Sequence, residues 1–147
     1  MLKEHLVYED FDGNKRERDF YFNLTPQEVS EMEYSHKGGM SAFLTRIMHE
    51  KDETELVKYF KEFLLMSYGK KSDDGELFVK NEQIKEELKS SMAFSELWMR
   101  FLTEEHAFEN FVKGVLPKDM DKYIAKMEKM PAVEVVVNNV ENNNTGN

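Results

Sequence analysis

The sequence of 147 residues contains no cysteine. This absence excludes a disulfide framework, a metal site with cysteine ligands and a catalytic thiol. Proline is scarce, with 3 residues, and no apolar run approaches the roughly 20 residues that a membrane-spanning helix needs. The N-terminus also lacks the apolar stretch of a signal peptide, so we expect a protein that stays where it is made and has no membrane partner.

Basic residues are outnumbered in this chain. Lys and Arg total 20 against 29 Asp and Glu, which gives a formal net charge of -9. Because nonspecific nucleic-acid binding depends on basic side chains that displace counterions from phosphates, this balance disfavours DNA or RNA as a partner. Apolar residues, in contrast, are plentiful, at 40% hydrophobic and 12% aromatic. At this chain length they predict one compact core.

The N-terminal segment predicts a β-hairpin. Asp12-Gly13-Asn14 is a turn sequence, since Gly and Asn tolerate the positive φ of tight hairpins. After the turn, Phe20, Phe22 and Leu24 recur with a two-residue period, which places three large apolar side chains on one face. A lone hairpin is only marginally stable in water, so we expect this face to pack against helices.

A set of about five to six helices is predicted after the hairpin. The first helix runs from Pro26 to about Ser35, because Thr25 and Glu28 form a capping box around Pro26. Apolar spacing predicts further helices over residues 40–48, 53–68, 81–102, 103–116 and 118–129. Residues 69–75 read as a polar turn after a helix end, and residues 77–79 as a short strand or an anchored loop.

The expected fold class is therefore α+β and mostly α, with an N-terminal hairpin packed on the helices. We predict a single domain over residues 1–131. Residues 132–147 are rich in asparagine and have few apolar groups to bury, so we expect a flexible C-terminal tail.

No pattern in the sequence predicts a reaction centre. The four histidines are scattered and form no metal-binding spacing, and no nucleophile elbow or phosphate-binding loop is present. His106 with Glu105 and Glu109 could bring a nitrogen and two carboxylates onto one helix surface. An acidic, solvated first turn of a helix is the simpler interpretation of these residues. We therefore predict no enzymatic activity, no cofactor and no bound metal.

Methionine is unusually frequent, with 10 residues. Met48 and Met99 have the spacing of core residues, whereas the short segment 118–129 is less clearly needed by the core. One face of this segment carries apolar residues at helical spacing: Met120, Tyr123, Ile124 and Met127. Flexible thioethers adapt to different partners, so this face is the first candidate partner-binding surface. The alternative is that the segment folds back on the body. The hairpin face with Phe20 and Phe22 is the second candidate.

Several stretches of the chain together resemble a known family. They are residues 8–14 (YEDFDGN), 18–26 (RDFYFNLTP), 31–33 (EME), 63–69 (FLLMSYG), 72–75 (SDDG), 94–97 (FSEL) and 111–117 (FVKGVLP). Through these stretches, the segment from Val7 to Pro117 is similar to tail assembly chaperones of long-tailed, siphovirus-type bacteriophages that infect Gram-positive bacteria. None of the stretches is a chemical motif, and the family has no catalytic residues to transfer.

The resemblance implies a non-enzymatic role in the infected cell. Such chaperones bind the tape measure protein, protect its hydrophobic segments from aggregation and help to recruit tail tube subunits. They act in the host cell cytoplasm and are absent from the mature virion. An acidic, methionine-rich, helical protein without a reaction centre is compatible with that role.

Two other functions remain open from the residues. The first is a small phage or bacterial regulatory adaptor that binds a host protein or nucleic acid, since a hairpin followed by helices can mimic a winged helix. The charge of -9 and the lack of a basic recognition helix argue against DNA binding. The second is a hydrolase that uses His106 with its neighbouring carboxylates. Self-association is also left open by the sequence.

Overall fold

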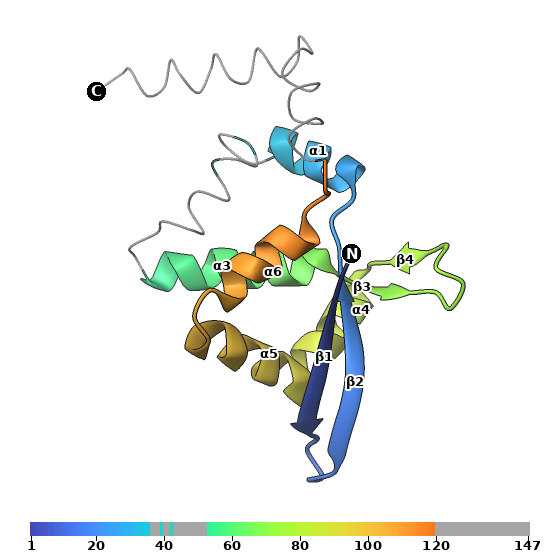
Figure 1. Cartoon of the computed structure of the whole chain (residues 1–147), viewed down its shortest axis with the longest axis vertical. Helices are drawn as coiled ribbons and strands as arrows, with labels where there is room; N and C mark the ends of the chain where they lie inside the picture. The colour runs from blue at the N-terminus through green and yellow to red at the C-terminus, as the bar shows by residue number, and fades with distance from the viewer. Residues whose placement is uncertain (36–38, 40–41, 43–52, 120–147) are drawn as a thin grey trace. The chain divides into compact units, whose positions relative to one another are not determined.

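The computed structural model describes residues 1–35, 39, 42 and 53–119. In this part of the chain there are four strands and five helices (Figure 1), which confirms the predicted α+β class with more helix than strand. The chain divides into two compact units. One comprises residues 1–23 and 64–116, and the other comprises residues 24–63 and 117–147. Most of the predicted helices 40–48 and 118–129, and the predicted tail, lie outside the described residues.

The first unit contains an antiparallel sheet with the strand order β1-β2-β3-β4. Its strands are β1 (Leu2–Glu9), β2 (Lys15–Phe22), β3 (Tyr68–Lys71) and β4 (Phe78–Val79). β1 and β2 form the predicted hairpin. At its turn, the Asp10 carboxylate accepts hydrogen bonds from the backbone N–H groups of Asp12 at 3.0 Å and Asn14 at 2.9 Å. Gly13 adopts the positive φ that this turn requires, at 81°.

The polar turn predicted to begin at residue 69 is wrong, because Tyr68–Lys71 is strand β3. Tyr68 lies opposite Phe22 of β2, and Lys71 lies opposite Phe78 of β4. A glycine after a helical stripe is typical of a helix end, yet here Gly69 permits close strand packing. A Cβ atom at Gly69 would lie 2.8 Å from the Phe78 ring and 2.9 Å from the Val79 carbonyl oxygen. The short run at 77–79 is in part a strand, as β4.

The second unit contains α1 (Pro26–Ser35) and most of α3 (Glu53–Ser67), which both match the predicted helices closely. The capping box of α1 is present as predicted. The Thr25 N–H donates to the Glu28 carboxylate at 3.0 Å, and the Glu28 N–H donates to the Thr25 hydroxyl at 3.2 Å. These reciprocal bonds satisfy backbone donors that the first helical turn leaves without partners.

The single long helix predicted over residues 81–102 is wrong. The chain forms α4 (Glu82–Lys89) and α5 (Met92–Thr103), which are separated at Ser90 and Ser91. The Ser91 hydroxyl caps α5 by accepting a hydrogen bond from the Phe94 N–H at 3.4 Å. Leu88 and Met92 have the four-residue spacing of a continuous helix, so periodicity alone could not reveal the break.

The last described helix, α6 (Ala107–Val115), begins later than predicted. Thr103 ends α5 instead of starting a new helix, and His106 precedes α6 with a left-handed φ of 61°. Such a φ is uncommon outside glycine, although histidine adopts it more readily than most residues. The three residues 104–106 therefore make a sharp corner between α5 and α6.

The core of the first unit forms between the hairpin and the last two helices. Leu6 and Phe22 point into it and are fully buried. The Phe22 ring meets the Phe111 ring of α6 edge-on, with centroids 5.0 Å apart, and Phe111 lies 4.8 Å from the Phe101 ring of α5. The apolar hairpin face thus packs against helices, as its two-residue period predicted.

Candidate protein-binding surface

Helix α5 carries more apolar residues than its buried side can use. Eight of its twelve residues are apolar. Ala93, Leu97 and Phe101 are buried on one side. On the other side Met92 is exposed, Met99 is 51% exposed and Leu102 is 58% exposed. A helix that is apolar almost all round is normally covered on all sides, yet among the described residues no element covers this side of α5.

We name the exposed residues Met92, Met99 and Leu102 the α5 face. Their spacing of seven and three residues places them along the same side of the helix. Exposed apolar groups that share one side mark contact sites for other proteins, and flexible methionines suit partners of varied shape. Exposed glutamates at 96, 104 and 105 lie close by in the sequence, so the surroundings of the face are acidic.

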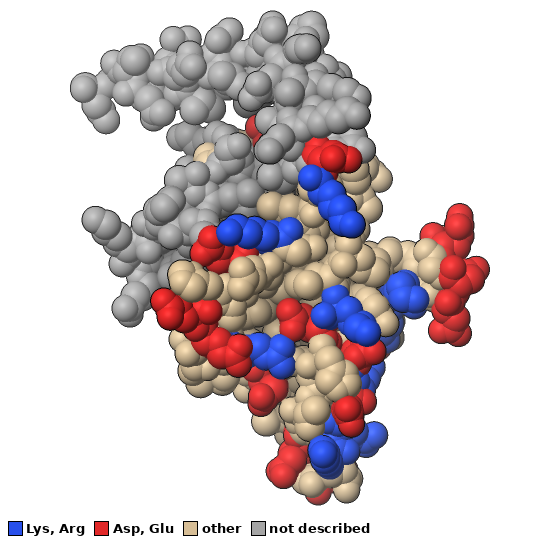
Figure 2. Space-filling model, in the orientation of Figure 1, with Lys and Arg blue, Asp and Glu red and all other residues tan. Residues whose placement is uncertain are grey.

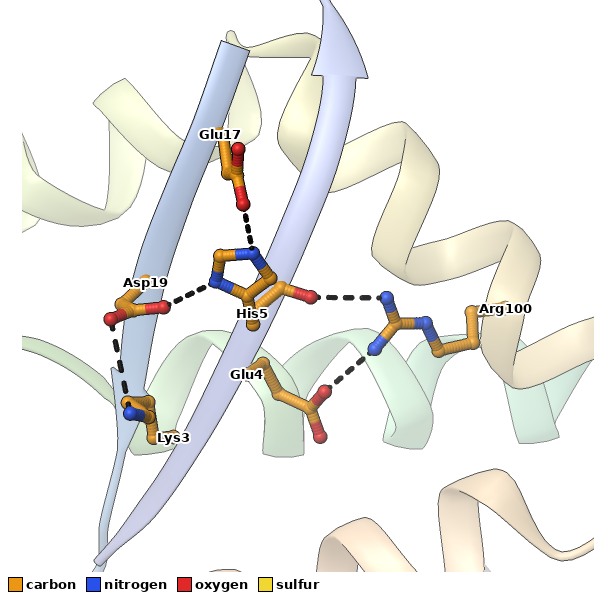
Figure 3. Close-up of polar contacts among 6 residues, drawn as sticks. All are labelled: Lys3, Glu4, His5, Glu17, Asp19 and Arg100. Atoms are coloured by element: carbon orange, nitrogen blue, oxygen red, sulfur yellow. Dashed lines mark hydrogen bonds and ion pairs between the residues drawn. The ribbon is translucent and has the colours of Figure 1, made fainter.

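An ion pair fixes α5 to the hairpin (Figure 3). The Arg100 guanidinium lies 2.7 Å from the Glu4 carboxylate and donates to the His5 carbonyl oxygen at 3.4 Å. Burial raises the pKa of Glu4, although the Arg100 guanidinium acts in the opposite direction. Because these bonds join residues far apart in sequence, they hold the helix and the strand together. The α5 face is therefore carried by a positioned element.

A second polar cluster lies on the outer face of the hairpin (Figure 3). The His5 ring contacts the Asp19 carboxylate at 2.7 Å and the Glu17 carboxylate at 2.9 Å, and Lys3 lies 3.9 Å from Asp19. Hydrogen bonds to Asp19 and Glu17 raise the pKa of His5, and the bond from His5 lowers the pKa of Asp19. These groups pair across two strands, so the cluster supports the hairpin.

The pH dependence of stability tests this cluster. A raised His5 pKa adds stability below its ordinary value of about 6.5, and that stability is lost as the pH rises through the folded pKa. Raising the pH from about 6 to about 8.5 should thus lower the melting temperature of the wild type more than that of His5→Gln. Thermal melts followed by circular dichroism give the comparison. Equal decreases in the two proteins would show that the His5 contacts do not stabilise the hairpin.

A family match identifies the chain. The family described as phage tail assembly chaperone matches residues 1–146. The chain belongs to this family. The match confirms the resemblance to phage tail assembly chaperones and extends it to nearly the whole chain. No curated protein and no solved structure gives a significant match. None of the helices within the described ranges is long and apolar enough to span a membrane.

The structure places the predicted site residues of this chaperone in different surroundings. Phe20 is 4% exposed and Phe22 is fully buried, so both rings are core residues with little surface for a partner. His106 lies 3.3 Å from both the Glu105 and Glu109 carboxylates. In the portion of the chain that is described, no group of three acidic, histidine or cysteine side chains could hold a metal ion. The predicted face at Met120, Tyr123, Ile124 and Met127 lies outside the described residues.

The apolar spacing of the sequence did not predict the α5 face of the chaperone. Met99 was predicted to fill a gap in the core, but half of its surface is exposed. The signal was present, since the segment MAFSELWMRFLT has more apolar residues than one buried stripe requires. Periodicity finds the buried side of such a helix and does not show whether another element covers the remaining side.

Proposed function

We propose that this tail assembly chaperone binds hydrophobic segments of the tape measure protein in the host cell cytoplasm and helps to recruit tail tube subunits. The α5 face, an exposed apolar surface on a firmly held helix, is the observation that carries the proposal. Membership of a chaperone family supports a role during assembly, without catalysis and outside the mature virion.

Both the apolar α5 face and the net charge of the chain suit a protein that covers apolar client segments. Burial of apolar surface supplies most of the free energy of such contacts, and it is not directional. Methionine and leucine side chains can therefore accept a series of related helical segments. The net charge of -9 makes complexes repel one another, which opposes aggregation while the client is held.

The C-terminal segment 118–129 is proposed as a second binding surface. Its apolar side chains share one side if the segment is helical. Replacing Ile124 with aspartate is expected to abolish client binding and to leave the melting temperature nearly unchanged, because a carboxylate would enter an apolar contact. Binding assays and thermal melts of the same preparation test both parts. A large drop in melting temperature would instead place Ile124 in the core.

Co-expression with the tape measure protein of the same phage tests the proposed function. We expect the chaperone to raise the soluble fraction of the tape measure protein and to co-purify with it. A second experiment, a pull-down of tagged chaperone from infected cells, should recover tape measure or tail tube protein. Recovery of host proteins or nucleic acid alone would overturn the proposal and favour a regulatory adaptor.

A further inference from the structure

The two ends of the α5 face have surroundings of opposite charge. Met92, the first residue of α5, lines a pocket together with two arginines of the β1–β2 hairpin. Leu102 lies about 15 Å further along the helix, and exposed Glu104 and Glu105 come shortly after it. In Figure 2 red side chains gather at the left, where α5 meets α6, whereas blue side chains stand beside red ones at the end of the hairpin. A partner that covers the whole face therefore meets basic groups at one end and acidic groups at the other.

The pocket at the Met92 end has a volume of about 300 Å³ and lies between the hairpin and the junction of α4 and α5. Tyr8 and Arg18 form part of its hairpin wall. Arg18 pairs with Leu6 across the two strands, and Leu6 is fully buried, so Arg18 points to the helix side of the sheet. Because Met92 belongs to both the pocket and the α5 face, the two surfaces are continuous.

The pocket keeps positive charge for a partner. The Arg16 Nε group donates to the Asp10 carboxylate at 2.7 Å, so these two charges offset each other. Arg18 forms no ion pair with a carboxylate of the described residues. A hydrogen bond from Lys70 at 2.8 Å lowers the pKa of Glu87, and the charge of Arg18 acts in the same direction. One carboxylate cannot offset both cations, so Arg18 can attract an acidic group of a partner.

The opposite end of the α5 face keeps negative charge. The Glu104 carboxylate forms no ion pair within the part of the chain that the structure describes. Arg100, one turn earlier in α5, is already bonded to Glu4 at 2.7 Å. Glu105 contacts only the His106 ring, at 3.3 Å, among the described residues. This end can therefore attract a basic group of a partner.

We propose that the α5 face selects client helices by the order of their charges. An acidic residue of the client would lie near Arg18, and a basic residue would lie near Glu104. The apolar side chains between them would cover Met92, Met99 and Leu102. A separation of about 15 Å corresponds to about ten or eleven residues of a helical client, which is three turns. The inference rests on the proposed function and adds the chemistry of the client to it.

Ordered charges also give the bound client a direction. Burial of apolar surface is not directional, so the α5 face alone accepts a client helix in either orientation. With charged ends, the reversed orientation places the acidic residue of the client near Glu104 and its basic residue near Arg18. Repulsion at both ends disfavours that orientation. Each client segment would thus lie one way along α5.

Three synthetic helical peptides of about 18 residues test the selection. They share one side of leucine and methionine residues and differ only at two positions on that side, about three turns apart. The first peptide has glutamate at one position and lysine at the other, the second has lysine at both and the third has glutamate at both. Fluorescence anisotropy at low salt should show that the wild type binds the first peptide about tenfold more tightly than the others, because an attraction at one end is replaced by a repulsion. Added salt should reduce the difference.

Charge reversal in the protein should change which peptide binds best. Arg18→Glu should prefer the peptide with two lysines, and replacement of both Glu104 and Glu105 with lysine should prefer the peptide with two glutamates. Such a gain of binding cannot result from a failure to fold. Lys15→Glu, on the same hairpin but outside the pocket, is the matched control and should keep the preference of the wild type.

Spin labels on the first peptide test the direction without any substitution in the protein. A nitroxide at the glutamate end should broaden the amide NMR signals of Arg18 and Met92, and a nitroxide at the lysine end should broaden those of Leu102 and Glu104. Equal affinity for the three peptides, or broadening at both ends of α5 from either label, would overturn the inference while the proposed function stands. Failure to bind any of the three peptides would also overturn it, and co-expression with the tape measure protein then decides about the proposed function separately.

Discussion

Replacing Phe111 with alanine is expected to lower the free energy of unfolding by about 3–5 kcal/mol. Phe111 is fully enclosed in the first unit, where its ring contacts Phe22, Phe101 and Phe108 at centroid distances of 5.0, 4.8 and 6.1 Å. The substitution removes a large buried ring and leaves a cavity between the sheet and two helices. It also removes three aromatic contacts at once.

Urea denaturation followed by circular dichroism measures this effect. Phe11→Ala is a matched control, because it deletes the same side chain from an exposed position at the hairpin turn. We expect the control to change the free energy of unfolding by no more than about 0.5 kcal/mol. Similar losses in the two variants would show that Phe111 does not hold the hairpin and the helices together.

Replacing both Met99 and Leu102 with glutamate is expected to weaken client binding at least about tenfold, with little change in stability. The two side chains are exposed in the free chaperone, so the glutamates remain in water when it folds. In the complex, however, they would have to enter an apolar contact, and burial of unpaired carboxylates is costly. Titration of a hydrophobic tape measure segment, with a thermal melt of each variant, gives the two quantities.

Val57→Glu provides the control for this double variant, since Val57 is an exposed apolar residue on another helix, α3. It should bind the client like the wild type. Unchanged affinity in the Met99→Glu, Leu102→Glu protein would exclude the α5 face as the binding surface and leave the segment around Ile124 as the remaining candidate. A large loss of stability in the double variant would show that the two side chains support the fold.

Local features of the fold could be predicted from the sequence with good accuracy. The hairpin turn depends on Asp12-Gly13-Asn14 and on the Asp10 side chain within it, and all of these contacts span four residues or fewer. The start of α1 depends on Thr25 and Glu28, which bond to each other. Interactions between such near neighbours form in the same way wherever the segment lies in the fold.

Strand β3 and the break before α5 could not be predicted in this way. Tyr68 and Gly69 follow a helix, and their strand conformation depends on pairing with β2, which lies more than forty residues earlier. At the break at Ser90 and Ser91, Leu88 and Met92 keep the spacing of a continuous helix, although the buried residues step from Leu88 to Ala93. Tertiary contacts override local preference at both places.

The candidate sites show the same division between features that the local sequence determines and features that depend on tertiary contacts. By itself, the sequence determined that the chain is acidic and free of cysteine, that it begins with a hairpin and that it resembles tail assembly chaperones, because composition and short-range patterns carry this information. Only the tertiary structure decided that Phe22 is buried while Met99 is exposed. Both are large apolar residues on amphipathic elements, and their exposure depends on whether a distant element covers them. The ring of Phe111 covers Phe22, whereas Met99 keeps half of its surface open to a partner.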